Sequence, residues 1–280
     1  MIQKKLLLNG LFCGWEHSDP DASLTLYLQE PSGEIDAGRM YPCVIVCPGG
    51  GYEFTSDREA EPVALRYAAM GYSAAVLRYS TGGAKFPTQL CELSMAAAFL
   101  RRRQEFQLHP QKIAVCGFSA GGHLAGSLCN LWNHPLLREL LPVEEGENKP
   151  DAAVLCYPVI SSGKFAHAGS FTNLLAEDAS ETSKELLSLE HSVNAENPPC
   201  FLWHTADDAS VPVENSLLYA MALRENRIRT ELHIYPEGSH GLSLAEYSTT
   251  NSQRLKSRTI AQWFPQSVRF LDEVFETPRY

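Results

Sequence analysis

The chain has 280 residues, of which 44% are hydrophobic and 20% are charged, and its formal net charge is −10. This length suits one large α/β domain, so we expect residues 1–280 to form a single domain. The negative charge, and the lack of any Lys/Arg block longer than Arg101–Arg103, argue against a nucleic-acid partner. No run approaches the roughly 20 apolar residues that cross a bilayer, so no membrane partner is expected. The oligomeric state stays open.

The N-terminal stretch and the cysteines both favour a cytoplasmic protein. Two lysines and three leucines precede Asn9 and Gly10, and this apolar run is too short for the core of a signal peptide. The eight cysteines have no CxxC spacing. We expect small buried thiols in a reducing compartment rather than disulfides, a redox centre or a metal site. Five of them lie in or beside apolar runs: Cys43, Cys47, Cys116, Cys156 and Cys200.

Short apolar runs with β-branched residues predict strands, and longer stretches of helical spacing separate most of them. Such alternation is typical of an α/β fold with a mostly parallel sheet and helices on both faces. The runs at 4–8 and 23–28 precede the first crossover helix, so we expect them at an antiparallel edge of an eight-stranded sheet. The other predicted strands are 43–47, 73–78, 112–116, 152–157, 200–204 and 231–235, and the predicted helices are 59–70, 88–107, 119–131, 212–226 and 257–275.

Two segments depart from this pattern. Residues 161–199 are rich in Ser, Ala, Asn and Glu and end at Pro198-Pro199. An insertion of this length in a compact α/β domain is usually functional or disordered, so we expect loop and short helices over the sheet edge, near the active site. Pro265 lies inside the last predicted helix and indicates a kink or a new start there.

Gly117-Phe118-Ser119-Ala120-Gly121 is a G-x-S-x-G sequence between a predicted strand and a predicted helix. In this context the strained turn exposes the serine hydroxyl, although an ordinary tight turn would give the same five residues. A serine hydroxyl becomes a nucleophile only beside a base that a third group orients. Ser119 therefore predicts two partners downstream. His123 lies one helical turn further on, and we expect it to be structural.

Both partners are found just after predicted strands. Asp207 follows strand 200–204, and His240 follows strand 231–235 between Gly238 and Gly241. Reactive groups collect beyond the carboxyl ends of parallel strands, and the order Ser, Asp, His is that of the α/β-hydrolases. Alone, the aspartate would equally cap a helix and the histidine would equally be an ordinary loop residue. Together they predict a catalytic triad with Ser119.

The glycine-rich run PGGGY at 48–52 follows another predicted strand. Glycine lets backbone N–H groups turn inward toward a ligand, and no Lys-Ser/Thr pair follows, which argues against a phosphate loop. Acyl transfer needs such donors for the oxyanion that forms on the carbonyl oxygen. We expect one donor to be the N–H group of Ala120, the residue after Ser119, and the other to come from this glycine loop.

Substrate contacts are predicted at the same edge. The run SDREAEP at 56–62 could meet sugar hydroxyls, or Ser56 or Asp57 could cap the following helix. Phe118 and Trp203 would equally suit the core. The candidate substrate-binding residues are Tyr52, Arg58, Phe118 and Trp203.

Four segments carry a resemblance to a known family. They are PGGGY at 48–52, GFSAGG at 117–122, WHTADDASVPVENS at 203–216 and EGSHGLSL at 237–244. The chain resembles the α/β-hydrolase serine esterases, in the carboxylesterase and carbohydrate (xylan-type) acetyl esterase branch related to the hormone-sensitive-lipase group. The lipase-like members begin the glycine loop with His. Pro48 stands there in this sequence, which points to the acetyl-esterase-like relatives.

The resemblance implies a serine carboxylic-ester hydrolase that cleaves acetyl and other short-chain esters, with acetylated carbohydrates as one substrate class. It assigns Ser119 as nucleophile, Asp207 as orienting carboxylate and His240 as base, with no metal or organic cofactor. It also implies that the oxyanion-hole donors are the N–H groups of Gly50, Gly51 and Ala120. A small-molecule ester is the expected partner. A serine peptidase or amidase of the prolyl-oligopeptidase type, or a non-catalytic binding module on the same scaffold, remains an alternative.

Overall fold

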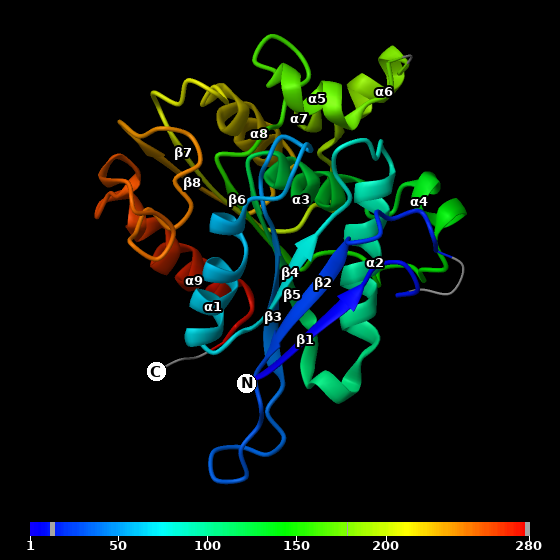
Figure 1. Ribbon diagram of the computed structural model, residues 1–280, viewed down its shortest axis with the longest axis vertical. Helices are drawn as coiled ribbons and strands as arrows, with labels where there is room; N and C mark the ends of the chain where they lie inside the picture. Colours follow the sequence, from blue (N-terminus) through cyan, green and yellow to red (C-terminus); the bar gives the residue numbers. More distant parts are fainter. Residues whose placement is uncertain (12–14, 178, 278–280) are drawn as a thin grey trace.

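The computed structural model describes residues 1–11, 15–177 and 179–277. Its strands form one sheet in the order β1-β2-β4-β3-β5-β6-β7-β8 (Figure 1). β1 and β2 are antiparallel to their neighbours, and β3 to β8 run parallel, which confirms the predicted sheet and its antiparallel edge. The strands are β1 Ile2–Leu7, β2 Ser23–Leu28, β3 Tyr41–Cys47, β4 Ser73–Arg78, β5 Leu108–Phe118, β6 Ala152–Cys156, β7 Cys200–Thr205 and β8 Thr230–Tyr235.

Helices cover both faces of the sheet, so its central strands are apolar on both sides. In β3, Ile45 contacts the core beneath one helical layer, and Val44 and Val46 contact the core beneath the other. This is why the strand reads as a continuous apolar run. One layer contains α2 Thr88–Arg102, α3 Ala120–Leu131 and α8 Glu214–Glu225, and the other contains α1 Glu61–Ala69 and α9 Trp263–Val274.

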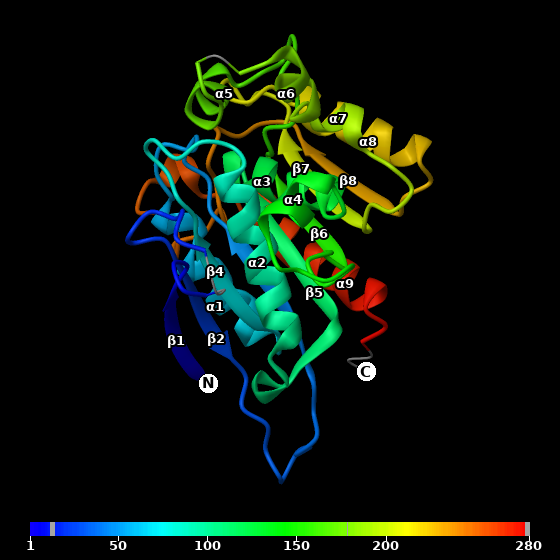
Figure 2. The same ribbon diagram turned by 90° about the vertical axis from the view of Figure 1, so that its right-hand side faces the viewer.

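The remaining helices lie outside these layers or were not predicted. The insertion 161–199 holds α5 Ala168–Leu174, α6 Glu181–Leu186 and α7 Leu189–Ser192, and Figure 2 shows α5 and α6 at one end of the molecule, beyond the strands. The loop between β2 and β3 projects from the opposite end. The short helix α4, Pro135–Leu140, gave no clear signal in the sequence.

Two further predictions can be compared with the structure. Pro265 lies in the first turn of α9, where a missing N–H costs no hydrogen bond, so the proline marks a new start rather than a kink. The five cysteines singled out from the sequence are free and buried, and burial raises the pKa of Cys43 to about 12. Within the described ranges, no helix has the length and apolar character needed to cross a membrane.

Candidate active site

Ser119 lies at the sharp turn between β5 and α3, in the backbone conformation φ 52°, ψ −119°. The turn packs tightly on its neighbours. A Cβ atom on Gly121 would lie 2.2 Å from the Cys47 carbonyl oxygen, and one on Gly117 would lie 2.2 Å from the Gly121 carbonyl oxygen. Only glycine fits at these two positions. The flanking glycines therefore allow the left-handed conformation that Ser119 adopts ahead of the helix.

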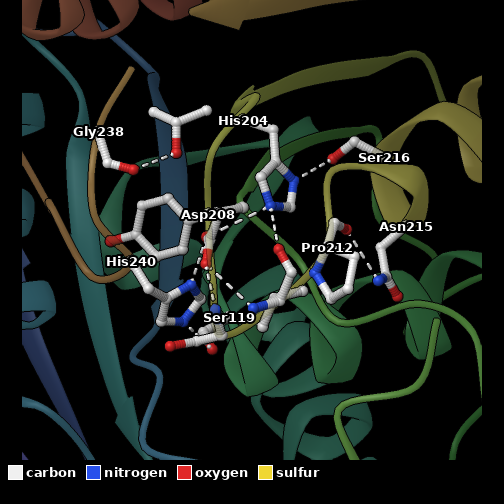
Figure 3. Close-up of polar contacts among 12 residues, drawn as sticks. Ser119, His204, Asp208, Pro212, Asn215, Ser216, Gly238 and His240 are labelled. Atoms are coloured by element: carbon white, nitrogen blue, oxygen red, sulfur yellow. Dashed lines mark hydrogen bonds and ion pairs between the residues drawn. The ribbon is translucent and has the colours of Figure 1, made fainter. Parts of the chain in front are cut away.

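His240 lies between Ser119 and a carboxylate. Its Nε2 atom is 2.7 Å from Ser119 Oγ, and its Nδ1 atom is 2.6 Å from Asp208 Oδ2 (Figure 3). When Nδ1–H donates to the carboxylate, Nε2 is left to accept the hydroxyl proton of the serine. The three side chains come from the ends of β5, β7 and β8, which meet at one edge of the sheet.

The prediction that Asp207 is the partner of His240 is wrong. Asp207 is exposed, and its Oδ1 atom accepts from the Gly238 N–H at 2.6 Å. Asp208 is buried, and its Oδ1 atom accepts from the N–H groups of Ser210 and Val211 at 2.9 and 3.0 Å. An aspartate that bonds the backbone two and three residues ahead forms an Asx turn, and this turn directs its second oxygen toward the histidine. No pattern in the sequence distinguishes the two neighbouring aspartates, because either could form an Asx turn.

A second histidine contacts the same carboxylate, and the sequence analysis did not identify it. His204 Nε2 lies 3.4 Å from Asp208 Oδ2 and 2.9 Å from the Val211 carbonyl oxygen, while Nδ1 is 2.8 Å from Ser216 Oγ. Burial raises the pKa of Asp208. Hydrogen bonds with His204 and His240, the charge of His240 and the hydrogen bond from the Val211 N–H lower the pKa by more than burial raises it. The pKa of Asp208 therefore falls below its ordinary value, and the side chain stays ionised.

The glycine loop after β3 has N–H groups available for a ligand. Gly50 and Gly51 have φ values of 134° and 63°, and a Cβ atom on Gly50 would lie 2.1 Å from the Phe54 carbonyl oxygen. Within the part of the chain that the structure describes, the N–H groups of Gly50, Gly51 and Ala120 have no hydrogen-bond acceptor. Three free donors flanking a buried serine suit the stabilisation of an oxyanion.

Comparison with known proteins identifies the family to which this chain belongs. The BD-FAE family matches residues 32–223. The chain belongs to this family. Two solved enzyme structures match nearly the whole chain. One is an acetyl ester-xyloside bifunctional hydrolase from Caldicellulosiruptor lactoaceticus, which is 38% identical with a TM-score of 0.78 over 95% of this chain and 97% of that one. The other is a carboxylesterase from Lactobacillus plantarum, which is 26% identical with a TM-score of 0.82 over 98% of both chains. The predicted relationship to α/β-hydrolase carboxylesterases and acetyl esterases is confirmed.

Curated relatives are longer proteins. Endo-1,4-beta-xylanase B of Butyrivibrio fibrisolvens is 36% identical over 215 residues, 72% of this chain and 33% of that protein. The acetylxylan esterase of Xylanibacter ruminicola is 26% identical over 248 residues, 85% of this chain and 47% of that protein. The chain thus spans between a third and a half of the length of these two relatives.

Three of the four predicted substrate contacts lie in the core of this BD-FAE chain instead. Tyr52, Phe118 and Trp203 are at most 1% exposed, so they do not line a pocket open to solvent, and that prediction is wrong. Arg58 is partly exposed, and its Nη2 atom lies 3.1 Å from the position of a Cβ atom on Gly241, next to His240. Arg58 therefore remains a candidate substrate contact.

The acidic residues of SDREAEP each have a partner within the protein. Asp57 pairs with Arg78 at 2.6 Å, and Glu61 accepts from the Tyr27 hydroxyl at 2.9 Å. Glu59 is buried. The alternative that Ser56 or Asp57 caps the following helix is wrong too, because neither side chain makes a capping bond.

The insertion lies against the site at several points. Asn173 Nδ2 donates to the Gly51 carbonyl at 2.8 Å. His123 accepts from the Tyr52 hydroxyl at 2.8 Å and donates from Nε2 to the Leu187 carbonyl at 2.9 Å; burial lowers its pKa to about 4, so it stays neutral in a structural role. Burial and the charge of His240 lower the pKa of His167, as expected of a neighbour of the triad. These contacts agree with an insertion near the active site.

Among the residues that the structure describes, no three His, Cys, Asp or Glu side chains are placed to hold a metal ion.

Proposed function

We propose that this chain is a serine carboxylic-ester hydrolase. The observation that carries the proposal is the continuous contact from Ser119 through His240 to Asp208, with distances of 2.7 and 2.6 Å. His240 Nε2 takes the serine proton as Ser119 Oγ attacks the ester carbonyl carbon. The carbonyl π bond opens to a tetrahedral oxyanion, which the N–H groups of Gly50, Gly51 and Ala120 stabilise.

The collapse of this intermediate and the later hydrolysis of the acyl-enzyme use the same groups. His240 returns its proton to the alkoxy oxygen, the bond from carbon to that oxygen breaks, and the alcohol leaves an acyl-Ser119 ester. Water then attacks the acyl carbon while His240 takes a proton from it, and a second tetrahedral intermediate forms. This intermediate collapses as the bond from carbon to Ser119 Oγ breaks and His240 gives its proton to Oγ, which releases the acid and the free serine. Asp208 stabilises the imidazolium in both steps and is not itself protonated.

We propose short-chain esters, acetyl esters of carbohydrates in particular, as the substrates. Two observations support this class. Relatives of similar sequence bear the names acetylxylan esterase and acetyl ester-xyloside hydrolase. Pro48 also begins the glycine loop where lipase-like enzymes have His. Residues 1–280 are proposed to act as one domain in the cytoplasm, which agrees with the free, buried cysteines of the described ranges.

The test is hydrolysis of p-nitrophenyl acetate by the wild type, Ser119→Ala and the control Ser127→Ala. Ser127 lies on the same helix, and its hydroxyl donates to the His123 carbonyl rather than to the triad. We expect Ser119→Ala to lose several orders of magnitude in kcat and Ser127→Ala to stay close to the wild type. Equal rates for Ser119→Ala and the wild type would leave only a binding module.

Substrate class requires a second comparison. Acetate, butyrate and octanoate esters are compared first. Acetylated xylo-oligosaccharides are then compared with proline amides under the same conditions. We expect kcat/KM to fall with acyl length and to favour the acetylated sugars. Faster turnover of the amides would favour the peptidase alternative.

A further inference from the structure

A second buried carboxylate lies beneath the site, and the mechanism above does not use it. Glu59, in the short helix η1 Asp57–Glu59, is 3% exposed. Its Oε2 atom accepts from the Gly49 N–H at 2.9 Å, and its Oε1 atom accepts from the Tyr157 hydroxyl at 2.6 Å. A buried carboxylate is costly unless donors surround it, so both bonds are needed to keep Glu59 in place.

The first bond holds the glycine loop. A Cβ atom on Gly49 would lie 2.7 Å from Glu59 Oε2 and 3.0 Å from Ser119 Cβ, so Gly49 packs tightly between the carboxylate and the serine. The Gly49 carbonyl accepts from the Ser56 N–H at 2.9 Å. In a trans peptide the next N–H, that of Gly50, points the opposite way. Glu59 and the turn before it thus fix the orientation of a proposed oxyanion donor.

The second bond reaches the histidine loop. The Tyr157 hydroxyl donates to Glu59 and accepts from the Ser243 N–H at 2.8 Å, three residues after His240. The Tyr157 ring packs edge-on against the His240 imidazole, with centroids 5.0 Å apart. Burial and the charge of Glu59 raise the pKa of Tyr157, so its hydroxyl keeps the proton that it donates. One carboxylate therefore ties together the two loops that flank Ser119.

We propose that Glu59 is a positioning residue, which holds the glycine loop through the Gly49 N–H and the His240 loop through the Tyr157 hydroxyl. The inference rests on the proposed function of Ser119. Glu59 does not touch the substrate. It acts by fixing where the oxyanion donors and the imidazole stand relative to the serine, and a displacement of about 1 Å in such groups costs roughly 100-fold in rate.

Two variants and one control test this role. Glu59→Gln keeps the shape but offers one acceptor oxygen to two donors, and Tyr157→Phe keeps the ring against His240 and removes only the bridge. Glu61→Gln makes the same change two residues on, where the partner is the Tyr27 hydroxyl at 2.9 Å. We expect kcat per titrated active site to fall 10-fold to 100-fold in the first two variants, with KM changed less than threefold. Glu61→Gln should match the wild type.

The inhibition constant of a trifluoromethyl ketone, which forms an oxyanion on Ser119, separates positioning from mere stability. It should rise in Glu59→Gln and Tyr157→Phe by the same factor as kcat/KM falls. A lower melting temperature with unchanged kcat and unchanged inhibition constant would overturn the proposal. Tyr157→Phe alone decides the matter if Glu59→Gln does not fold. A wild type that neither hydrolyses the ester nor reacts with a fluorophosphonate at Ser119 would overturn the proposed function, and this inference with it.

Discussion

Replacing Asp208 with Asn should leave the fold intact and reverse the hydrogen bond to His240. Asp208 Oδ1 accepts two backbone N–H groups, from Ser210 and Val211, so the amide oxygen of Asn would occupy that position. The NH₂ group would then face His240 Nδ1, where Oδ2 stands 2.6 Å away in the wild type. The imidazole would have to accept at Nδ1 and carry its proton on Nε2, so it could not take the serine proton.

The expected magnitude follows from that wrong tautomer. The same change in serine-protease triads lowers kcat about 10⁴-fold, and at 1.36 kcal/mol per decade this corresponds to roughly 5 kcal/mol of lost transition-state stabilisation. Asp207→Asn is the matched control, because an amide oxygen can still accept from the Gly238 N–H. We expect this control to keep nearly full activity.

The assay is steady-state hydrolysis of p-nitrophenyl acetate, with active sites titrated and folding checked by near-ultraviolet circular dichroism. A folded Asp208→Asn variant that retains wild-type kcat, or an Asp207→Asn variant that loses as much as its neighbour, would refute the assignment of the carboxylate.

Two other predictions concern the turn and the pH dependence of stability. Gly121→Ala places a Cβ atom 2.2 Å from the Cys47 carbonyl oxygen, so we expect a loss of about 1–3 kcal/mol in the free energy of unfolding and a lower kcat. Gly33→Ala is the control, because Gly33 has open space around it, and it should change neither quantity. Urea denaturation and rate assays measure the two. Burial raises the pKa of Glu92 to about 7, above its unfolded value near 4.5. The folded state then binds the extra proton between these pH values, so this group's contribution to stability should fall as pH rises from about 5 to about 7 and stay low above it. Glu92→Gln should flatten that slope in denaturation curves; equal slopes in the two proteins would contradict it.

The fold was predictable because its signals are local. Each predicted strand lies within two residues of the observed bounds at one end or both. For central strands such as β3 the reason is that a strand covered on two faces must be apolar throughout. β5 is the main exception. It begins at Leu108 rather than 112, because the residues from His109 to Lys112 are exposed or only partly buried and give no apolar run.

The order of residues along the chain predicted part of the site. Ser119 and His240 were found because each follows a strand and has glycine neighbours. The choice between Asp207 and Asp208 depended on which carboxylate the loop turns inward, and that is set by the bonds from the N–H groups of Ser210 and Val211. Glu59 was missed for a related reason. Its partners lie 10 and 98 residues away in the chain, and no spacing rule joins them.

The attachment of the insertion has a consequence for how substrate enters. Asn173 bonds the Gly51 carbonyl at 2.8 Å, and His123 bonds the Leu187 carbonyl at 2.9 Å, so this segment is anchored both to the glycine loop and to α3. This segment cannot move aside as a lipase lid does without displacing the glycine loop that carries the proposed oxyanion donors. We therefore expect hydrolysis of dissolved esters to follow simple saturation, with no jump in rate when micelles or droplets form.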